Sequence, residues 1–171
     1  MTATSAKSLP RVAAVQMISG PEVDANLAEA GRLIALAVER GANLVALPEY
    51  FPIMGMDERD KIKVREEEGR GPIQDFLADT ARRHRIWLVG GSVPLVASTP
   101  DKVRNTTLVF DERGRRVARY DKIHLFAFEG AKESYSEPRT IEAGSDVVVV
   151  DSPFGRLGLS ICYDLRFPEL Y

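Results

Sequence analysis

The sequence predicts an α/β fold, because apolar runs of strand length alternate with amphipathic segments of helical length. The opening unit consists of an apolar run at 11–18, a helix from about Asp24 to Arg40, and a second apolar run at 43–47. A strand, a helix and a strand in this order predict parallel pairing through a right-handed crossover. The length of 171 residues suggests one domain with a sizeable core.

Residues that start and stop helices support both predicted helices. Asp24 is expected to cap the first helix, and Gly41 follows its last turn, where glycine is favoured. Pro72 is expected to begin the second helix, which runs to about His84, because proline fits the first turn. The apolar stripes are Leu27, Ile34 and Val38 in the first helix, and Ile73, Phe76, Leu77 and Ala81 in the second.

The rest of the chain contains shorter elements. In order, we expect a strand at 86–89, a turn-rich link at 93–101, hairpin strands at 104–110 and 116–120, a long loop at 125–144, and strands at 147–150 and 157–161. Asp111–Gly114 joins the hairpin strands, and its glycine supplies the positive φ of a tight turn. The charged stretch at 54–70 is most simply a solvated helix or loop.

Cys162 is the only cysteine of the chain and follows its last apolar run. The run at 157–161 has one polar side chain, Ser160, which suits a strand buried on both faces. Pro168 indicates the first turn of a new helix soon afterwards. In α/β proteins the ends of core strands present reactive side chains to a cleft. The alternative is a buried cysteine that acts as a small hydrophobe.

Glu49 and Lys122 also stand at the ends of predicted core strands. Together with Cys162 they supply three roles that acyl transfer needs. A thiolate attacks a carbonyl carbon, a carboxylate moves the protons, and a fixed cation meets the charge that develops on the oxygen. As alternatives, Glu49 can be a capping or solvent-facing carboxylate and Lys122 an ordinary lysine at a sheet edge.

Histidine catalysis and metal binding have less support. His84 lies at a helix end, where a positive charge is favourable, and is expected to be structural. His124 follows Lys122 closely, so a Cys162–His124 pair stays as an alternative, although no residue stands out to orient the ring. Two histidines and one cysteine give no recognised ligand spacing, and no nucleotide-binding motif is present, so we expect no metal and no cofactor.

Composition restricts the partners and the compartment. The net charge of −2 and the pI near 5.8 show no basic excess, so no nucleic-acid partner is expected. A single cysteine fits a reducing compartment, and no apolar run suggests a signal peptide or a membrane span. We therefore expect a cytoplasmic protein with a flexible tail at 1–10 and one domain at 11–171.

Three separated motifs give the chain a resemblance to the nitrilase, or carbon–nitrogen hydrolase, superfamily. They are LVALPEYF around Glu49, YDKIHLF around Lys122 and GLSICYDLRFPELY around Cys162. Their order and their placement at strand ends match the family pattern over nearly the whole chain. The resemblance implies a four-layer αββα sandwich, with Glu49 as general base, Lys122 as oxyanion stabiliser and Cys162 as nucleophile.

The resemblance also implies supporting residues. A second glutamate is expected in the loop after the lysine motif, and Glu137 in SYSEPRT matches better than Glu133. The backbone N–H of Tyr163 is expected to share the oxyanion hole. Arg166 is expected either to contact substrate or to form a structural salt bridge with Glu169.

Within the superfamily, the motifs look most like the omega-amidase and deaminated-glutathione-amidase branch. The implied reaction is hydrolysis of an amide of a small carboxylic or 2-oxo acid through a cysteine thioester, with release of ammonia, in a homo-oligomer. A nitrilase or an N-carbamoyl amide hydrolase with the same triad is one alternative. Family members normally continue well beyond the nucleophile, so an N-terminal piece of the fold, with its sheet partly uncovered, is expected. A non-catalytic remnant or assembly module is then the other alternative.

Overall fold

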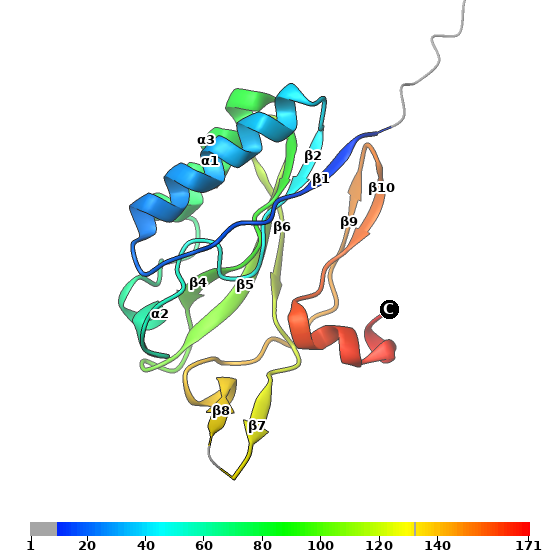
Figure 1. Ribbon diagram of the computed structural model, residues 1–171. Helices are drawn as coiled ribbons and strands as arrows, with labels where there is room; N and C mark the ends of the chain where they lie inside the picture. The colour runs from blue at the N-terminus through cyan, green and yellow to red at the C-terminus, as the bar shows by residue number, and fades with distance from the viewer. Residues whose placement is uncertain (1–9, 132) are drawn as a thin grey trace, which may run out of the picture.

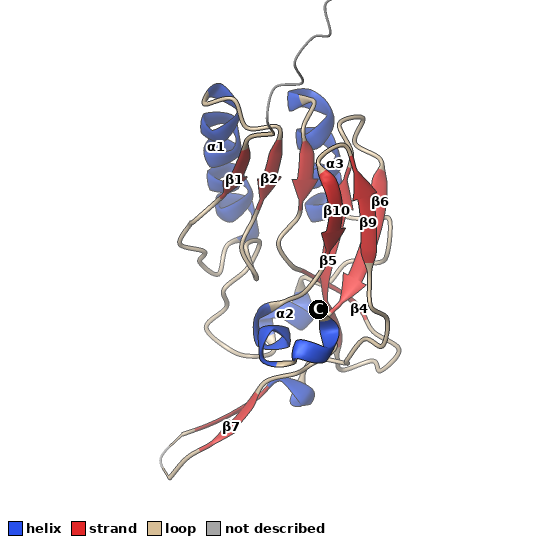
Figure 2. Cartoon of the chain, turned by 90° about the vertical axis from the view of Figure 1, so that its right-hand side faces the viewer, coloured by secondary structure: helices blue, strands red, loops and turns tan. Residues whose placement is uncertain are grey.

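A six-stranded sheet forms the centre of the computed structural model, which describes residues 10–131 and 133–171. Helices α1 (Val23–Glu39) and α3 (Pro72–His84) pack side by side on one face of this sheet (Figure 1). A hairpin of β9 (Val149–Ser152) and β10 (Gly155–Gly158) lies over the other face (Figure 2). The predicted flexible tail lies outside the described residues, apart from Pro10.

The sheet combines a parallel half with an antiparallel half. Its strands are β1 (Val12–Ala14), β2 (Leu44–Ala46), β3 (Trp87–Val89), β4 (Val93–Val96), β5 (Val103–Phe110) and β6 (Arg116–Asp121). Strands β1, β2 and β3 pair in parallel in chain order, as the strand–helix–strand pattern predicts. Strand β5 then pairs antiparallel with β3, β4 and β6, so it joins the two halves of the sheet.

Two apolar layers lie on opposite faces of the sheet. Two consecutive residues of β3 illustrate this, because Leu88 packs under the helices while Trp87 packs toward the β9–β10 hairpin. Strands that are covered on both faces read as continuous apolar runs, which is why their positions were predictable. The result is a mixed α/β fold with the order helix, sheet, hairpin. A second helical layer, which the four-layer sandwich adds, is not present among the described residues.

Two predictions are wrong: the residue that caps the first helix, and the turn-rich link at 93–101. Helix α1 begins at Val23, with Glu22 before it, and no side chain in the described part of the chain caps it, so Asp24 does not have the predicted role. The buried Asn26 instead binds the backbone oxygens of Gly20 and Pro52, which fixes the chain on either side of α1. The segment 93–101 contains β4, whose Pro94 obscures the strand pattern but is tolerated because β4 is an edge strand.

The C-terminal third also differs from the prediction. The loop at 125–144 contains a projecting hairpin of β7 (Ala127–Glu129) and β8 (Ser134–Ser136), and a 3-10 helix at Glu137–Arg139 (Figure 1). The run at 157–161 is not a core strand, because β10 ends at Gly158 and pairs with β9 outside the main sheet. Within this run Leu159 and Ile161 are buried. The apolar residues of the run therefore indicate a segment that is covered on one face and not on both.

The remaining short elements lie around one end of the sheet. Helix α2 (Asp60–Lys63) lies in the charged segment that sequence left unassigned. Two further 3-10 helices, Cys162–Arg166 and Pro168–Leu170, end the chain. In the part of the chain that the structure describes, no helix combines the length and apolarity needed to cross a membrane.

Gly91 allows the loop after β2 to approach β3 closely. Its φ is +55°, and a Cβ there would lie 2.1 Å from the backbone oxygen of Pro48. The neighbouring Ser92 accepts a hydrogen bond from the backbone N–H of Tyr50 at 3.0 Å. These contacts fix the Pro48–Tyr50 segment, and with it Glu49, against the sheet.

We expect Gly91→Ala to lower the free energy of unfolding by at least about 2 kcal/mol, because it adds a backbone clash to an unfavourable φ. Urea denaturation followed by circular dichroism measures the change. Gly158→Ala is the matched control, since a Cβ at Gly158 meets nothing within 4 Å. Equal stabilities of the two variants would contradict the prediction.

Candidate active site

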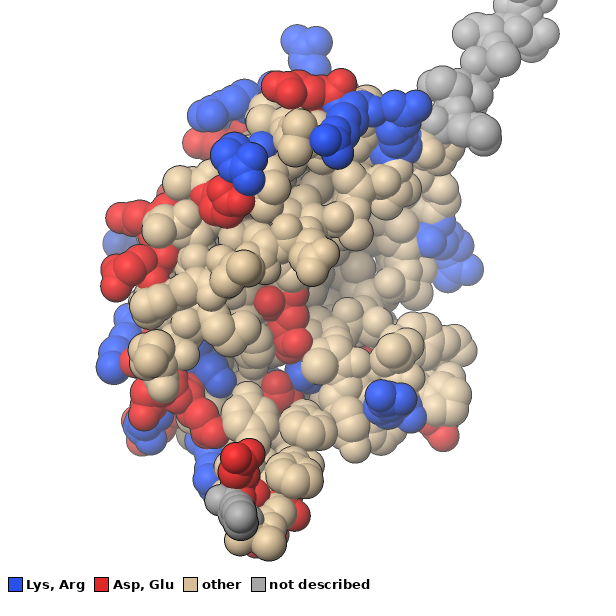
Figure 3. All heavy atoms as spheres, viewed as in Figure 1, with Lys and Arg blue, Asp and Glu red and all other residues tan. Residues whose placement is uncertain are grey.

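The three residues singled out by sequence lie at one end of the sheet. Glu49 follows β2, Lys122 follows β6, and Cys162 begins the 3-10 helix after Ile161. Glu49 and Cys162 both line a cleft of about 320 Å³ between the sheet and the start of that helix. In the space-filling view, acidic atoms with basic atoms beside them are visible in a central hollow of the molecule (Figure 3). Folding therefore gathers the three side chains, although 73 residues separate Glu49 from Lys122.

Lys122 is the centre of the charged cluster. Its side chain is 1 % exposed, and its Nζ lies 2.8 Å from Glu137 Oε1 and 3.2 Å from Glu49 Oε1. Burial by itself would lower the pKa of Lys122, but the hydrogen bond to Glu137 and the charges of both glutamates outweigh it and raise the pKa. Lys122 is thus a fixed, protonated cation and not the ordinary edge lysine of the alternative reading.

Glu137 is the second carboxylate that holds Lys122. Its Oε2 accepts a hydrogen bond from the backbone N–H of Phe126 at 2.6 Å, and Tyr50 donates to its Oε1 at 3.4 Å. Burial and the charge of Glu137 raise the pKa of the Tyr50 hydroxyl well above its usual range, so it remains a donor. Glu133, the second choice from sequence, is exposed next to β8.

Glu49 faces the same cluster with a quarter of its side chain exposed. Its Oε1 accepts hydrogen bonds from Asn105 Nδ2 at 2.8 Å and from Lys122 Nζ at 3.2 Å. Both bonds end on Oε1, which leaves Oε2 for a further partner. Glu49 is therefore neither a helix cap nor a carboxylate directed only at solvent, which were the alternatives from sequence.

Cys162 is exposed and stands at a sharp turn. Its φ of 49° is unusual for a residue with a side chain, and such strain is typical of functional turns. Desolvation raises the pKa of the Cys162 thiol, and the charge of Glu49 and its hydrogen bond raise it further, while Lys122 lowers it. The thiol is thus mostly protonated at neutral pH and adjoins a carboxylate, and it is not the buried hydrophobe of the alternative reading.

Asp164 ties this turn to the end of β6, and sequence reasoning did not identify its role. The carboxylate is fully buried and accepts hydrogen bonds from Ile161 N at 2.9 Å, Tyr120 Oη at 2.5 Å and His124 N at 2.9 Å. Desolvation opposes its ionisation, but these bonds prevail and the pKa of Asp164 is lowered. Isoleucine has no side-chain acceptor, so the spacing from Ile161 to Asp164 is not a capping-box signature, and no local sequence pattern marked this role.

His124 also binds Asp164, which corrects the prediction that nothing orients its ring. Its Nδ1 lies 2.7 Å from Asp164 Oδ1, and its ring stacks on Phe167 with the centroids 3.6 Å apart. The arrangement therefore makes His124 part of the support of the turn rather than a partner of the thiol.

The remaining predicted residues flank the cleft. The N–H group of Tyr163 directly follows Cys162, and its ring contacts Phe126 edge-on at 5.2 Å between centroids. Arg166 and Glu169 are both exposed, and within the described residues they form no ion pair with each other, so the predicted salt bridge is wrong. Arg166 is left with a solvent-facing guanidinium at the edge of the turn.

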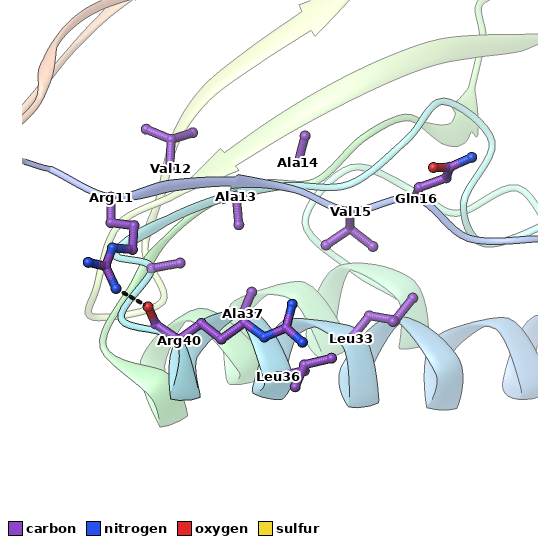
Figure 4. Close-up of a pocket in the computed structure, with 11 residues that line it drawn as sticks. Arg11, Val12, Ala13, Ala14, Val15, Gln16, Leu33, Leu36, Ala37 and Arg40 are labelled. Carbon is purple, nitrogen blue, oxygen red and sulfur yellow. Dashed lines mark hydrogen bonds between the residues drawn. The ribbon is translucent and has the colours of Figure 1, made fainter.

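A second pocket, of about 310 Å³, lies between β1 and α1 (Figure 4). Its walls are mainly apolar, and the guanidinium of Arg11 binds the backbone oxygen of Arg40 at one end. None of the described residues that line it carries a thiol or a carboxylate. Glu49 and Cys162 line the first cleft, and Lys122 Nζ lies 3.2 Å from Glu49, so a nucleophile, a carboxylate and a cation are adjacent there. This combination can carry acyl transfer.

The chain belongs to the carbon–nitrogen hydrolase family, whose model matches residues 11–171. The chain is 41% identical over 163 residues to a deaminated glutathione amidase of Synechocystis, covering 93% of the chain and 59% of that protein. It is 34% identical over 166 residues to the omega-amidase NIT3 of Saccharomyces cerevisiae, covering 94% of the chain and 57% of that protein. These relatives lie in the branch that the sequence motifs indicated.

Solved structures agree with this assignment. The crystal structure of the NitFhit protein of Caenorhabditis elegans superimposes with a TM-score of 0.79 and 35% identity, over 93% of this chain and 39% of that one. The predicted α/β fold of the nitrilase type is thereby confirmed. The chain spans less than three-fifths of the length of each of these three proteins.

We expect Asp164→Asn to lower the free energy of unfolding at pH 7 by about 2–3 kcal/mol, because an amide cannot accept all the hydrogen bonds of the buried carboxylate. The folded pKa of Asp164 is lowered, so its stabilisation is present above the unfolded value of about 3.9. It is lost as the pH falls through the folded pKa. Urea titrations at pH 7 and below pH 4 measure this, with the exposed Asp146→Asn as control.

Alkylation of Cys162 by iodoacetamide tests the electrostatics of the cleft, because the chain has one cysteine. The midpoint of the rate against pH should lie above that of a free thiol, near 8.5. Glu49→Gln removes a charge that raises the thiol pKa and should move the midpoint to lower pH. Lys122→Met should move it to higher pH.

The exposed Lys63 provides the control for these charge changes, because its ion pair is with Asp60 at 2.7 Å on α2. Lys63→Met should leave the alkylation midpoint of Cys162 where it is. Shifts of the same sign in Glu49→Gln and Lys122→Met would contradict the arrangement of charges described above.

Proposed function

We propose that the protein is an amidase that hydrolyses amides of small carboxylic or 2-oxo acids through a thioester on Cys162. The observation that carries the proposal is the shared site of Glu49, Lys122 and Cys162, with Lys122 held 3.2 Å from Glu49. A carboxylate, a fixed cation and a thiol are the groups that this reaction needs. Family membership supports the same chemistry.

In the first half of the proposed reaction, Glu49 accepts the proton of the Cys162 thiol, and the sulfur attacks the carbonyl carbon of the amide. The carbonyl π bond opens as the C–S bond forms, and the negative charge on the oxygen is met by Lys122 and by the N–H of Tyr163. When this intermediate collapses, the C–N bond breaks and Glu49 returns its proton to the nitrogen. Ammonia leaves, and the acyl group remains on the sulfur.

In the second half, a water molecule takes the place of ammonia. Glu49 accepts one of its protons while the water oxygen attacks the thioester carbonyl, and the same donors meet the oxyanion. The C–S bond then breaks, the carboxylic acid leaves, and the proton on Glu49 restores the thiol. Each half uses Glu49 once as base and once as acid.

The environment of Lys122 supports its role as a cation and not as a base. A lysine that acts as a base needs a lowered pKa, whereas the pKa of Lys122 is raised by its hydrogen bond to Glu137 and by both glutamate charges, against the effect of burial. Glu137 binds a backbone N–H through its other oxygen and so anchors the ammonium. We assign Glu137 to this supporting role.

The substrate class follows from the relatives rather than from the cleft. Deaminated glutathione amidase and omega-amidase are the names of two relatives, and both describe amidases. We propose a small 2-oxo-acid amide for this protein, with Arg166 available to its carboxylate. A cytoplasmic location and a homo-oligomer remain part of the same proposal.

The test is ammonia release from a panel that contains a 2-oxo-acid amide, a simple nitrile and an N-carbamoyl amino acid. We expect turnover of the amide and a loss of at least about a thousandfold in Cys162→Ala, with unchanged thermal unfolding. Mass spectrometry after acid quenching should find the acyl group on the peptide that contains Cys162. Turnover in Cys162→Ala would reject the mechanism, and preference for the nitrile or carbamoyl compound would replace the substrate class.

A further inference from the structure

Asn105 contacts both polar partners of the candidate site, although no role for it has been given so far. It lies in β5 and is 1 % exposed. Its side-chain Nδ2 donates to Glu49 Oε1 at 2.8 Å, and its backbone oxygen accepts the N–H of Lys122 at 2.9 Å. One buried residue of the joining strand therefore binds the carboxylate through its side chain and the start of the lysine segment through its backbone.

The orientation of the Asn105 side chain is set by Glu49 and by no other described residue. Its Oδ1 is buried and has no hydrogen-bond partner within residues 10–131 and 133–171. Exchanging the two amide atoms would direct Oδ1 at the carboxylate oxygen of Glu49, and two acceptors would then face each other. An unsatisfied buried acceptor is destabilising, and such groups in folded proteins call for a functional explanation.

The hydrogen bonds to Glu49 leave one carboxylate oxygen for chemistry. Oε1 receives two donors, Asn105 in β5 and Lys122 just after β6. Two donors from different directions fix the plane of the carboxylate, whereas one donor would let the group rotate about its bond to that donor. The result is a carboxylate of fixed orientation whose Oε2 is left to other partners, and Glu49 and Cys162 line the same cleft.

A neutral second donor has a particular advantage next to Lys122. The ammonium of Lys122 is shared between Glu49, Glu137 and, in the proposed reaction, the oxyanion. When the oxyanion forms, Lys122 binds it at the expense of Glu49. Asn105 can then still hold the carboxylate, and it adds no charge that would compete with the cation.

We propose that Asn105 is a positioning residue, which holds Glu49 so that its Oε2 faces the Cys162 thiol and, later, the attacking water. The inference rests on the proposed function, because Glu49 must be the base for its position to affect the rate. Misplacement of a catalytic group by about 1 Å can cost a hundredfold in rate. Asn105 does not line the cleft, so its effect should fall on kcat and not on KM.

The first experiment compares Asn105→Ala and Asn105→Asp with wild type on the amide that wild type hydrolyses. We expect kcat to fall about 10- to 100-fold in both variants, while KM changes by less than about threefold. Asn105→Asp keeps the size of the side chain, so it remains informative if Asn105→Ala does not fold. Wild-type kcat in a folded Asn105 variant would overturn the inference.

Thr106→Val is the matched control. Thr106 is the next residue of β5, is fully buried, and donates to Asp121 Oδ1 at 2.6 Å, away from Glu49. It tests what loss of a buried hydrogen bond in this strand does by itself. We expect thermal unfolding to shift in Thr106→Val while kcat stays within about twofold of wild type, and an equal fall in kcat would overturn the inference.

A double-mutant cycle then separates positioning from a general effect on the fold. Glu49→Asp retains a carboxylate but withdraws it by one methylene from the 2.8 Å contact with Asn105. In this background, Asn105→Ala should cost less than about threefold in kcat, because the contact is already lost. If kcat of the double variant fell by the product of the two single-variant losses, the inference would be overturned.

The activity of the wild-type protein in these assays shows whether the proposed function or only the role of Asn105 has failed. If wild type releases no ammonia from any amide of the panel, the proposed function fails, and the inference fails with it. If wild type is active and Cys162→Ala is not, but the Asn105 variants behave like Thr106→Val, the inference alone fails.

Discussion

The structure depends on a buried ammonium group that is held between two carboxylates. Lys122 is almost completely removed from solvent, and a lone ammonium in that position would be costly to bury. Glu137 and Glu49 compensate its charge, and Glu137 is anchored in turn by the N–H of Phe126. The segments that supply these groups must therefore converge for the protein to fold, and their convergence builds the candidate site.

Another buried carboxylate, that of Asp164, fixes the turn that carries the nucleophile. Asp164 collects hydrogen bonds from Ile161, Tyr120 and His124 and so connects the turn that carries Cys162 to the end of β6. Because Lys122 lies between Tyr120 and His124, the same strand end positions both the cation and the thiol. The positive φ of Cys162 is maintained by this network rather than by local preference.

Sequence reasoning succeeded where a feature is local or where separated motifs occur together. Helices α1 and α3 and the parallel strands β1 to β3 follow from the apolar patterns, and the fold brings the motif residues Glu49, Lys122 and Cys162 to one end of the sheet. It failed for β4, because Pro94 conceals the pattern, and for the run before Cys162, because apolar residues alone do not say how many faces are covered. The roles of Asn105 and Asp164 were not predicted, because the sequence does not show which groups a single amide or carboxylate will contact after folding.

The sequence by itself therefore determined the alternation of strands and helices, the absence of a second thiol, and the family to which the chain belongs. Local sterics and hydrophobic periodicity act over a few residues, so they can be read along the chain. Only the tertiary structure decided that Lys122 is buried, that Glu137 rather than Glu133 stands beside it, and that His124 binds Asp164. These outcomes depend on distances between residues remote in sequence, and the strength of an electrostatic contact follows from that distance and from burial.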